Sequence, residues 1–354
     1  MPMLRVAVLA AVLAVPACIP PDDLEPRAVV QANATDPQCP QDDCGNGNSP
    51  VINGVYFWML SSFGAGNDQG VKISSVERYD GTAMRLIAEG DRLRGVHPVT
   101  NAPLADHQAL LNTRITVSVD GLLYRIRIGY VTSSSTSLPQ DDHEHFWVGA
   151  RTAVEAYEFY YTPLSDPNRR ETPLCMPLAD DPENPGIRAI VFTGDNYDPV
   201  TKKITLGAAT SGWMNIACHK SAPYKMHLIG HTTAASSRLG IWTTLDKRQA
   251  MLNAWTMNAC GTGTAFTIQG TPITLTESQF LLPATSPFQM APVATEAIWG
   301  PKGAVCLDTP RVPSGTTLEE QLANIQDECG LVLPSCSSML TTWTSSGSVL
   351  TGTP

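Results

Sequence analysis

The sequence predicts an α+β fold that is rich in β-strands, with mainly antiparallel sheets and two or three short helices in the C-terminal half. Three observations lead to this prediction. Apolar and polar residues alternate repeatedly in the segments that follow residue 50. The 27 Gly and 28 Pro residues among 354 indicate many turns and short connections. Segments with a helical spacing of apolar residues, uninterrupted by Gly or Pro, are found after residue 220.

The clearest strand signal is RITVSVDGLLYRIRIGYV, residues 114–131. Apolar residues alternate with polar ones on both sides of Asp120-Gly121, and Asp-Gly between two such runs is a strong hairpin signal. Arg125 and Arg127 fall on the solvent-facing side, where spaced charges need no functional explanation. Further strands are predicted at VYFWML, VKISSVERY, AMRLIAEGDRL, HFWVGA and VEAYEFYYT. We therefore expect residues 51–165 to form an antiparallel β domain.

A second domain, residues 166–354, is predicted to follow the polar, proline-containing segment SDPNRRETPLC. Strands are expected within IRAIVFTGDNYDPVTKKITLG and at GWMNIAC, which ends at Cys218. Asp195 and Asp198 are assigned to a hairpin turn between the first two of these strands, with weak calcium binding as the alternative. A hairpin is also expected in AFTIQGTPITL, residues 265–275.

Three helices are predicted in this second domain. APYKMHLIGH is short, whereas LDKRQAMLNAWTMN has an approximate apolar stripe and is followed by Gly261, a typical stop signal. The third helix spans TLEEQLANIQDE, residues 317–328. Thr317 can cap it and Glu320 stands three residues later, as in a capping box.

The N-terminus, MPMLRVAVLAAVLAVPAC, resembles an export signal. One positive charge, Arg5, precedes an apolar run that is too short to span a bilayer. The run ends in Val-Pro-Ala-Cys18, which resembles a bacterial lipobox and predicts lipidation of Cys18. The alternative is ordinary signal-peptide cleavage nearby, with Cys18 incidental. In both cases residues 1–18 predict export, to the outer membrane or cell surface as a lipoprotein, or to the periplasm or exterior. The Pro- and Asp-rich residues 19–50 read as a flexible tether.

The cysteines support an oxidising compartment. The chain has nine, and lipidation of Cys18 would leave an even number. In an exported protein these remaining residues predict up to four disulfides. They are Cys39, Cys44, Cys175, Cys218, Cys260, Cys306, Cys329 and Cys336. Eight cysteines allow 105 pairings, so the sequence leaves the connectivity open.

Several segments resemble the ADYC domain, a family of exported proteins, many of them lipoproteins of myxobacteria and related bacteria. The resemblance rests on PLC at 173–175, GWMNIAC at 212–218, AWTMNACGTGTAFTIQGTPI at 254–273 and EAIWGPKGAVCLDTPR at 296–311. The naming motif Ala-Asp-Tyr-Cys corresponds to Met257-Asn258-Ala259-Cys260, so only its cysteine is shared. The resemblance implies export and disulfides, but no known activity.

Searches for catalytic and metal-binding patterns return only weak matches. G-x-S-x-G, P-loop, G-x-G-x-x-G and H-E-x-x-H motifs are absent. His143 and His145, beside Asp141 and Asp142, could share a metal on a strand; the alternative is a polar loop. His227 and His231 have zinc-ligand spacing on a helix, but no third ligand is obvious. His219, beside Cys218, is expected to be a strand-end residue.

We therefore predict an exported, lipid-anchored, disulfide-stabilised protein of the cell envelope that acts as a non-catalytic binding or structural module. The alternative is a secreted metal-dependent hydrolase that uses a histidine cluster drawn from His143, His145, His219, His227 and His231. No cofactor is predicted. The expected partners are a membrane, through the lipid, and a protein or glycan ligand. Nucleic acid is excluded as a partner because the net charge is −10 and no basic run is present.

Overall fold

The computed structural model describes about three fifths of the chain. The described residues are 51–52, 55–57, 59–131, 154–175, 188–198, 200–207, 212–218, 221–233, 243–267, 274–277, 294–313, 315–339 and 349–353. The predicted fold class is confirmed, because these residues form antiparallel sheets and three α-helices that all lie in the C-terminal half. Within these ranges, no helix has both the length and the apolar character needed to cross a membrane.

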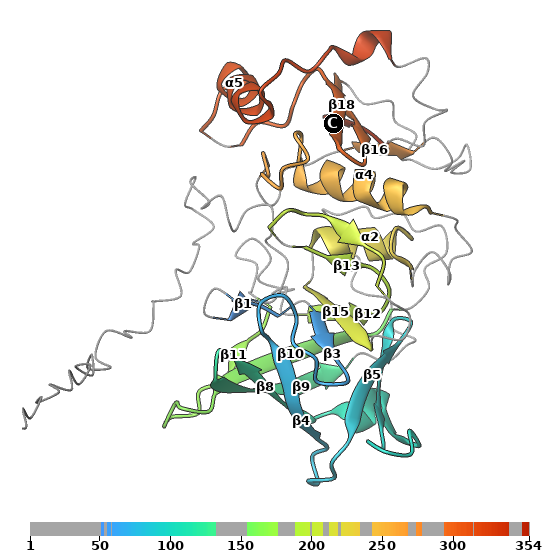
Figure 1. Ribbon diagram of the computed structural model, residues 1–354, viewed down its shortest axis with the longest axis vertical. Helices are drawn as coiled ribbons and strands as arrows, with labels where there is room; N and C mark the ends of the chain where they lie inside the picture. The colour runs from blue at the N-terminus through green and yellow to red at the C-terminus, as the bar shows by residue number, and fades with distance from the viewer. Residues whose placement is uncertain are drawn as a thin grey trace, which may run out of the picture. The chain divides into compact units, whose positions relative to one another are not determined.

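The largest sheet has strands in the order β3-β15-β12-β10-β9-β8-β4, with β11 paired to β10 (Figure 1). Its members are β3 (Met59–Ser61), β4 (Lys72–Glu77), β8 (Arg114–Val119), β9 (Leu122–Val131), β10 (Ala156–Pro163), β11 (Thr172–Pro173), β12 (Arg188–Phe192) and β15 (Trp213–Cys218). Every pairing is antiparallel. The sheet thus contains strands from both sides of residue 165, the position of the predicted domain boundary.

Four smaller sheets complete the described strands. They are β5 (Arg85–Glu89), β6 (Arg92–Val96) and β7 (Pro103–Asp106); β16 (Thr274–Glu277), β19 (Val349–Thr353), β17 (Ala294–Gly300) and β18 (Gly303–Leu307); β13 (Asn196–Tyr197) and β14 (Ile204–Thr205); and β1 (Val51–Ile52) and β2 (Val55–Tyr56). The described part of the hairpin expected at 265–275 shows a different pairing, because residues 274–275 lie in β16, which pairs with β19 near the end of the chain. Residues 268–273 lie outside the described residues. Residues 265–267 belong to no strand.

The predicted hairpin at residues 114–131 is confirmed. Val119 pairs with Leu122, and the two residues between them, Asp120 and Gly121, have φ angles of 48° and 81°. Two successive residues with positive φ form the turn that best matches the twist of paired strands. Ile115 and Val117 of β8 and Tyr124, Ile126 and Ile128 of β9 consequently face the core. Arg125 and Arg127 face the opposite side.

All three predicted helices are present, each with a side-chain N-cap. They are α2 (Ala222–Leu228), α4 (Leu245–Thr256) and α5 (Leu318–Cys329); short 3-10 turns η2 (His107–Leu110) and η3 (Cys336–Ser338) accompany them. Ser221 caps α2, Thr244 caps α4, and Thr317 forms the expected capping box with Glu320. Hydroxyl caps satisfy amide groups that the first helical turn leaves unpaired.

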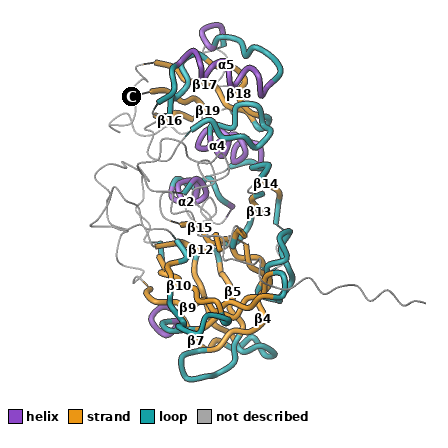
Figure 2. The backbone as a smooth tube through the Cα atoms, turned by 90° about the vertical axis from the view of Figure 1, so that its left-hand side faces the viewer, coloured by secondary structure: helices purple, strands orange, loops and turns teal. Residues whose placement is uncertain are grey.

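Burial divides the large sheet into two parts. In β12 and β15, neighbouring residues contribute alternately to two different core clusters: Val191 and Ile216 to one, Ile190 and Ala217 to the other. Both faces of these strands are therefore covered, which explains their continuous apolar sequences. Helix α2 lies beside β15 and contributes to the second cluster (Figure 2). Strands β8 and β9, by contrast, bury only one face.

Helix α4 is buried all around rather than along one stripe. Every residue from Lys247 to Ala254 is buried, including Gln249 and Asn253. Gln249 accepts a hydrogen bond from Ile204 N at 2.7 Å and donates one to Lys202 O at 2.9 Å, and Asn253 donates to Gly300 O at 2.9 Å. The expected one-sided apolar stripe is thus wrong, because polar side chains on the other faces bond to the surrounding segments.

Two buried ion pairs hold α4 in place. Arg248 binds Asp195 through two hydrogen bonds of 2.5 and 3.0 Å. At the other end of the helix, Arg311 donates to Glu296 at 2.7 Å and to the carbonyl oxygen of Ala254 at 2.5 Å. The assignment of Asp195 to a hairpin turn is wrong, because Asp195 precedes β13 and its side chain binds Arg248. Asp198 does lie in the turn between β13 and β14, where it accepts hydrogen bonds from the amides of residues 200 and 201.

We expect Arg248→Met to lower the free energy of unfolding by about 3–5 kcal/mol, because it leaves the Asp195 carboxylate buried without its partner. The double variant Asp195→Asn/Arg248→Met should cost less than the single one, since no uncompensated charge remains. Arg78→Met, which breaks the more exposed pair with Asp80, should cost far less than Arg248→Met, because solvent screens an exposed ion pair. Urea unfolding measures all three. A double variant less stable than the single one would contradict the assignment.

Candidate functional site

Three disulfides join the predicted cysteines in the described chain. They are Cys175–Cys218, Cys260–Cys329 and Cys306–Cys336, with sequence separations of 43, 69 and 30 residues. The first links the residues after β11 to the end of β15, and the third links β18 to η3. Cys18, Cys39 and Cys44 lie outside the described residues.

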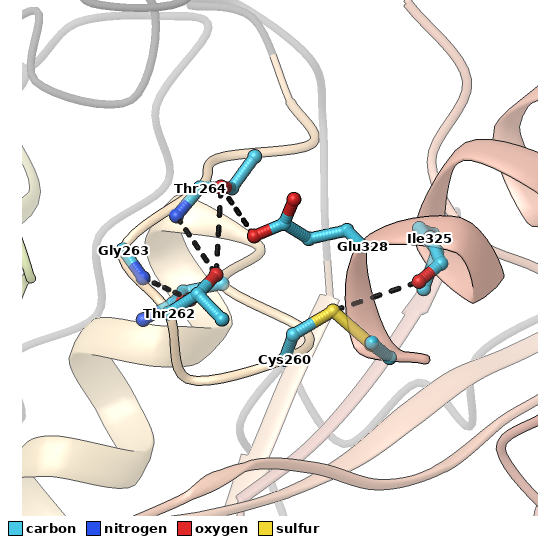
Figure 3. The surroundings of a disulfide bond; sticks show 8 residues. Cys260, Thr262, Gly263, Thr264, Ile325 and Glu328 are labelled. Atoms are coloured by element: carbon cyan, nitrogen blue, oxygen red, sulfur yellow. Dashed lines mark hydrogen bonds between the residues drawn. A yellow bond between two sulfur atoms is a disulfide. The ribbon is translucent and has the colours of Figure 1, made fainter. Parts of the chain in front are cut away.

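Cys260 lies at the corner where the chain leaves α4. Its disulfide partner is Cys329, the last residue of α5, so the ends of the two helices are joined covalently. A second contact lies beside the disulfide, where the Thr264 hydroxyl donates to the Glu328 carboxylate at 2.9 Å (Figure 3). The motif cysteine therefore fixes the relative position of two helix ends.

Close backbone packing explains the glycines after Cys260. Gly261 has a φ of +68°, and a Cβ there would lie 2.3 Å from the carbonyl oxygen of Lys302. Gly303 has a φ of +116°, and its Cβ would lie 2.3 Å from the carbonyl oxygen of Ala259. The amide of Ala304 donates to that same carbonyl at 2.8 Å. The corner thus rests directly on the β17–β18 turn, with no room for side chains.

Asn258 organises the corner from within. The resemblance described above aligns it with the Asp of Ala-Asp-Tyr-Cys, and its side chain is buried. Its side-chain oxygen accepts from Gly263 N at 3.0 Å, and its amide donates to Asn253 on α4 at 3.2 Å. The first bond is one that a carboxylate oxygen could also accept, whereas the second needs an amide.

A group of titratable side chains lies elsewhere in the described chain, around residue 155. We name it the carboxylate cluster: Asp91, His107, Glu155, Tyr157 and His227. The buried Glu155 accepts a hydrogen bond from the Tyr157 hydroxyl at 2.6 Å and lies 2.5 Å from Nδ1 of His107. The amide of Leu93 donates to the Tyr157 oxygen at 2.9 Å. Burial, followed by the hydrogen bond to Glu155, raises the pKa of Tyr157 well above its ordinary value.

The second half of the cluster connects α2 to the turn before β6. Nε2 of His227 lies 3.6 Å from an oxygen of Asp91, and its Nδ1 lies 2.8 Å from the Thr232 hydroxyl. The imidazole also stacks on the ring of Phe192, with 4.7 Å between the ring centres. Asp91 contributes to the raised pKa of Tyr157, so the two halves of the cluster interact electrostatically.

The predicted histidine cluster is only partly covered by the described chain. His227 and His231 are both buried, and Nδ1 of His231 lies 3.2 Å from the carbonyl oxygen of Ile229. His143, His145 and His219 fall outside the described residues, as do Asp141 and Asp142. Within the described ranges, no three His, Cys, Asp or Glu side chains are arranged to hold a metal ion.

The side chains of Thr232, His227 and Asp91 contact one another in the arrangement of a catalytic triad, in which a hydroxyl, an imidazole and a carboxylate follow one another. A nucleophile must reach its substrate, however, and both Thr232 and His227 have 0% of their surface exposed. In this arrangement the three side chains join α2, the segment after it and the β5–β6 turn. The geometry therefore supports a structural role for these groups.

Sequence reasoning identified only His227 of this cluster. The other members lie between 70 and 136 residues before it, and no local pattern connects them. The sequence contains one indication of this cluster. Glu155 is separated by an even number of residues from Tyr157, Phe159 and Tyr161, so it continues the row of residues on the buried face of β10. An acidic residue at a core-facing position of a strand indicates a buried partner.

We expect Gly261→Ala to destabilise the protein by about 1–3 kcal/mol more than Gly330→Ala. The two glycines have nearly equal φ angles of +68° and +64°, but a Cβ at Gly330 meets nothing within 4 Å. Gly330→Ala therefore incurs only the cost of placing a Cβ on a left-handed backbone conformation, about 1–2 kcal/mol. Thermal or urea unfolding gives the difference, and equal losses would contradict the tight corner.

We expect Tyr157→Phe to lower the free energy of unfolding by about 1–3 kcal/mol at neutral pH, because Glu155 and Leu93 N lose their partner. The folded pKa of Tyr157 is raised above its ordinary 10.0, so its stabilising effect is fully present below pH 10 and lost as the pH rises. The difference between wild type and variant should therefore shrink above pH 10. Tyr79→Phe, whose ring is exposed, serves as the control in the same alkaline unfolding series. A constant difference would contradict the prediction.

Comparison with known proteins gives one match. The family model of the ADYC domain matches residues 107–313, more than half of the chain. No match is found among curated proteins or among solved structures. The matched region runs from η2 to beyond β18 and contains the Cys260 corner, the Asp195–Arg248 ion pair and all of the carboxylate cluster except Asp91. The chain therefore belongs to the ADYC domain family.

Proposed function

We propose that this protein is an exported, lipid-anchored module of the cell envelope that binds a partner without catalysing a reaction. The observation that carries the proposal is the set of three disulfides, which together join residues between 175 and 336. Disulfides persist in oxidising compartments and are rare in the cytosol. Membership of the ADYC domain family agrees with this setting.

The sequence before residue 51 supports the lipid anchor. An apolar run stops at Cys18, and 32 residues rich in Pro, Asp and Asn separate that cysteine from β1. A tether of this composition would hold the folded body away from a membrane surface while keeping it attached. The anchor and the tether both precede the described residues, so this part of the proposal rests on the sequence.

The polar groups of the described chain support a binding or structural role. The groups that most resemble catalytic machinery are buried and occupied with one another, as in Glu155–Tyr157 and Thr232–His227. Side chains used in this way stabilise the fold and present nothing to a substrate. Recognition would then take place on an outer surface, with a protein, glycan or lipid as the partner.

Lipidation at Cys18 is tested by the mass of the mature protein. We expect the chain expressed with its own N-terminus in a bacterium to begin at Cys18, to carry diacylglycerol and to fractionate with membranes. Cys18→Ala should abolish the lipid and release the protein, whereas Cys44→Ala should retain the lipid. An unmodified N-terminus elsewhere in the wild-type chain would refute the anchor and leave ordinary secretion.

A further inference from the structure

The outward face of β8, β9 and β10 is arranged in cross-strand rows. One row holds Arg114, Arg127 and Tyr160, and the next holds Thr116, Arg125 and Thr162. A third row, at the turn end of β9, holds Ser118 and Leu123. Leu164 lies beside Leu123, because its amide donates to the Leu123 carbonyl at 2.9 Å. The face therefore changes from cationic to apolar toward the hairpin tip.

Three leucines make this tip apolar. Leu122, Leu123 and Leu164 are 54%, 45% and 40% exposed. Leu122 and Leu123 directly follow the Asp120-Gly121 turn, and Leu164 directly follows β10. Single exposed apolar side chains are common, but a group of them at one turn indicates a contact surface.

Arginines surround the leucine tip. Arg125 stands one row away from Leu123, and among the described residues no carboxylate lies within ion-pair distance of it. Arg127 stacks on Tyr160 at 5.1 Å and pairs with Glu171. The loop between Leu164 and Glu171 adds the exposed Arg169 and Arg170.

The acidic groups nearby are fewer and mostly engaged. Asp166 accepts hydrogen bonds from the amides of Asn168 and Arg170 at 2.8 and 3.3 Å, and Glu171 is paired with Arg127. Asp120 occupies the turn itself, and Glu77 lies opposite Arg114 on β4. Glu158, on the same face of β10, accepts a hydrogen bond from the Tyr160 hydroxyl and lies 3.8 Å from Arg188. With Arg188 and with Lys72, which lies opposite Ser118 on β4, seven cationic side chains outnumber these five carboxylates, although the whole chain has a net charge of −10.

We propose that the leucine tip, defined as Leu122, Leu123 and Leu164, docks on an anionic phospholipid surface. The leucines enter the acyl boundary, and Arg125, Arg169 and Arg170 extend to the phosphates, a geometry that long cationic side chains favour at membrane interfaces. Local positive charge at this end can draw an acidic protein to an anionic bilayer. The inference deepens the proposed function by naming a partner, and it requires no lipid on Cys18.

Charge decides against a second copy of the chain as the occupant. A two-fold contact through the leucine tip would place the same face against itself. Arg125, Arg169 and Arg170 would then meet arginines of the other copy, and like charges brought together oppose association. An anionic bilayer offers the apolar layer and the negative charge together.

The test uses the chain from residue 19 onward, so that Cys18 and its lipid are absent. The protein is produced in an oxidising compartment, where its disulfides can form. Sedimentation with vesicles of phosphatidylglycerol and phosphatidylcholine measures its partition coefficient. We expect binding that falls by roughly tenfold or more in Leu123→Ser/Leu164→Ser, because exposed leucines supply the buried apolar area. Arg169→Gln/Arg170→Gln should also weaken binding and reduce its dependence on salt.

The matched control is Leu331→Ser/Val332→Ser, which removes two other apolar side chains that are 54% and 71% exposed. It should bind as the wild type does, and vesicles of phosphatidylcholine alone should bind weakly. The proposal is overturned if the control and the tip variant lose binding equally, if charge of the lipid has no effect, or if no binding occurs. If the wild type forms a dimer and does not bind vesicles, and if the tip variant is a monomer, the leucine tip is instead a self-association surface. Failure of lipidation at Cys18 would leave each of these outcomes unchanged.

Discussion

Helix α4 carries Lys, Arg, Gln and Asn side chains and is buried on all sides. Neighbouring segments of the C-terminal half supply hydrogen-bond partners for these polar groups. Polar groups removed from water are costly unless they are hydrogen-bonded. Each polar face of α4 therefore has its own partner segment: Asp195 before β13, the turn between β13 and β14, Gly300 at the end of β17, and Arg311. These contacts define where the neighbouring segments must lie.

The Cys260 corner extends the same constraint to α5. Gln321 of α5 donates hydrogen bonds to the carbonyl oxygens of Phe266 and Arg311, at 2.6 and 3.1 Å, and so reaches the segments that close over α4. The disulfide to Cys329 joins the two helix ends covalently, and Gly261 lets the chain pass against the β17–β18 turn. Hydrogen bonds, a covalent bond and close backbone packing thus act on one junction, which accounts for a motif cysteine followed by Gly-Thr-Gly.

The large sheet separates a structural part from an accessible part. Strands β12 and β15 are covered on both faces and connect two core clusters, whereas β8 and β9 keep one face open. The carboxylate cluster lies in the covered region and joins segments that are distant in sequence. The arginines and leucines lie on the open face, where a partner could reach them. The buried groups that stabilise the fold and the surface that we propose for recognition therefore lie on different faces of the same sheet.

The sequence by itself determined the local structure: the Asp120-Gly121 hairpin, the capped helices and the alternation that orients β8 and β9 all depend on neighbouring residues. It also predicted the family and the presence of disulfides. Tertiary structure alone decided the cysteine pairing, the pairing of β16 with β19, and the partners of Asp195, Glu155 and His227. These depend on contacts between residues that are far apart in the chain. Periodicity reports which face of an element is buried, but it carries no information about which distant residue covers that face.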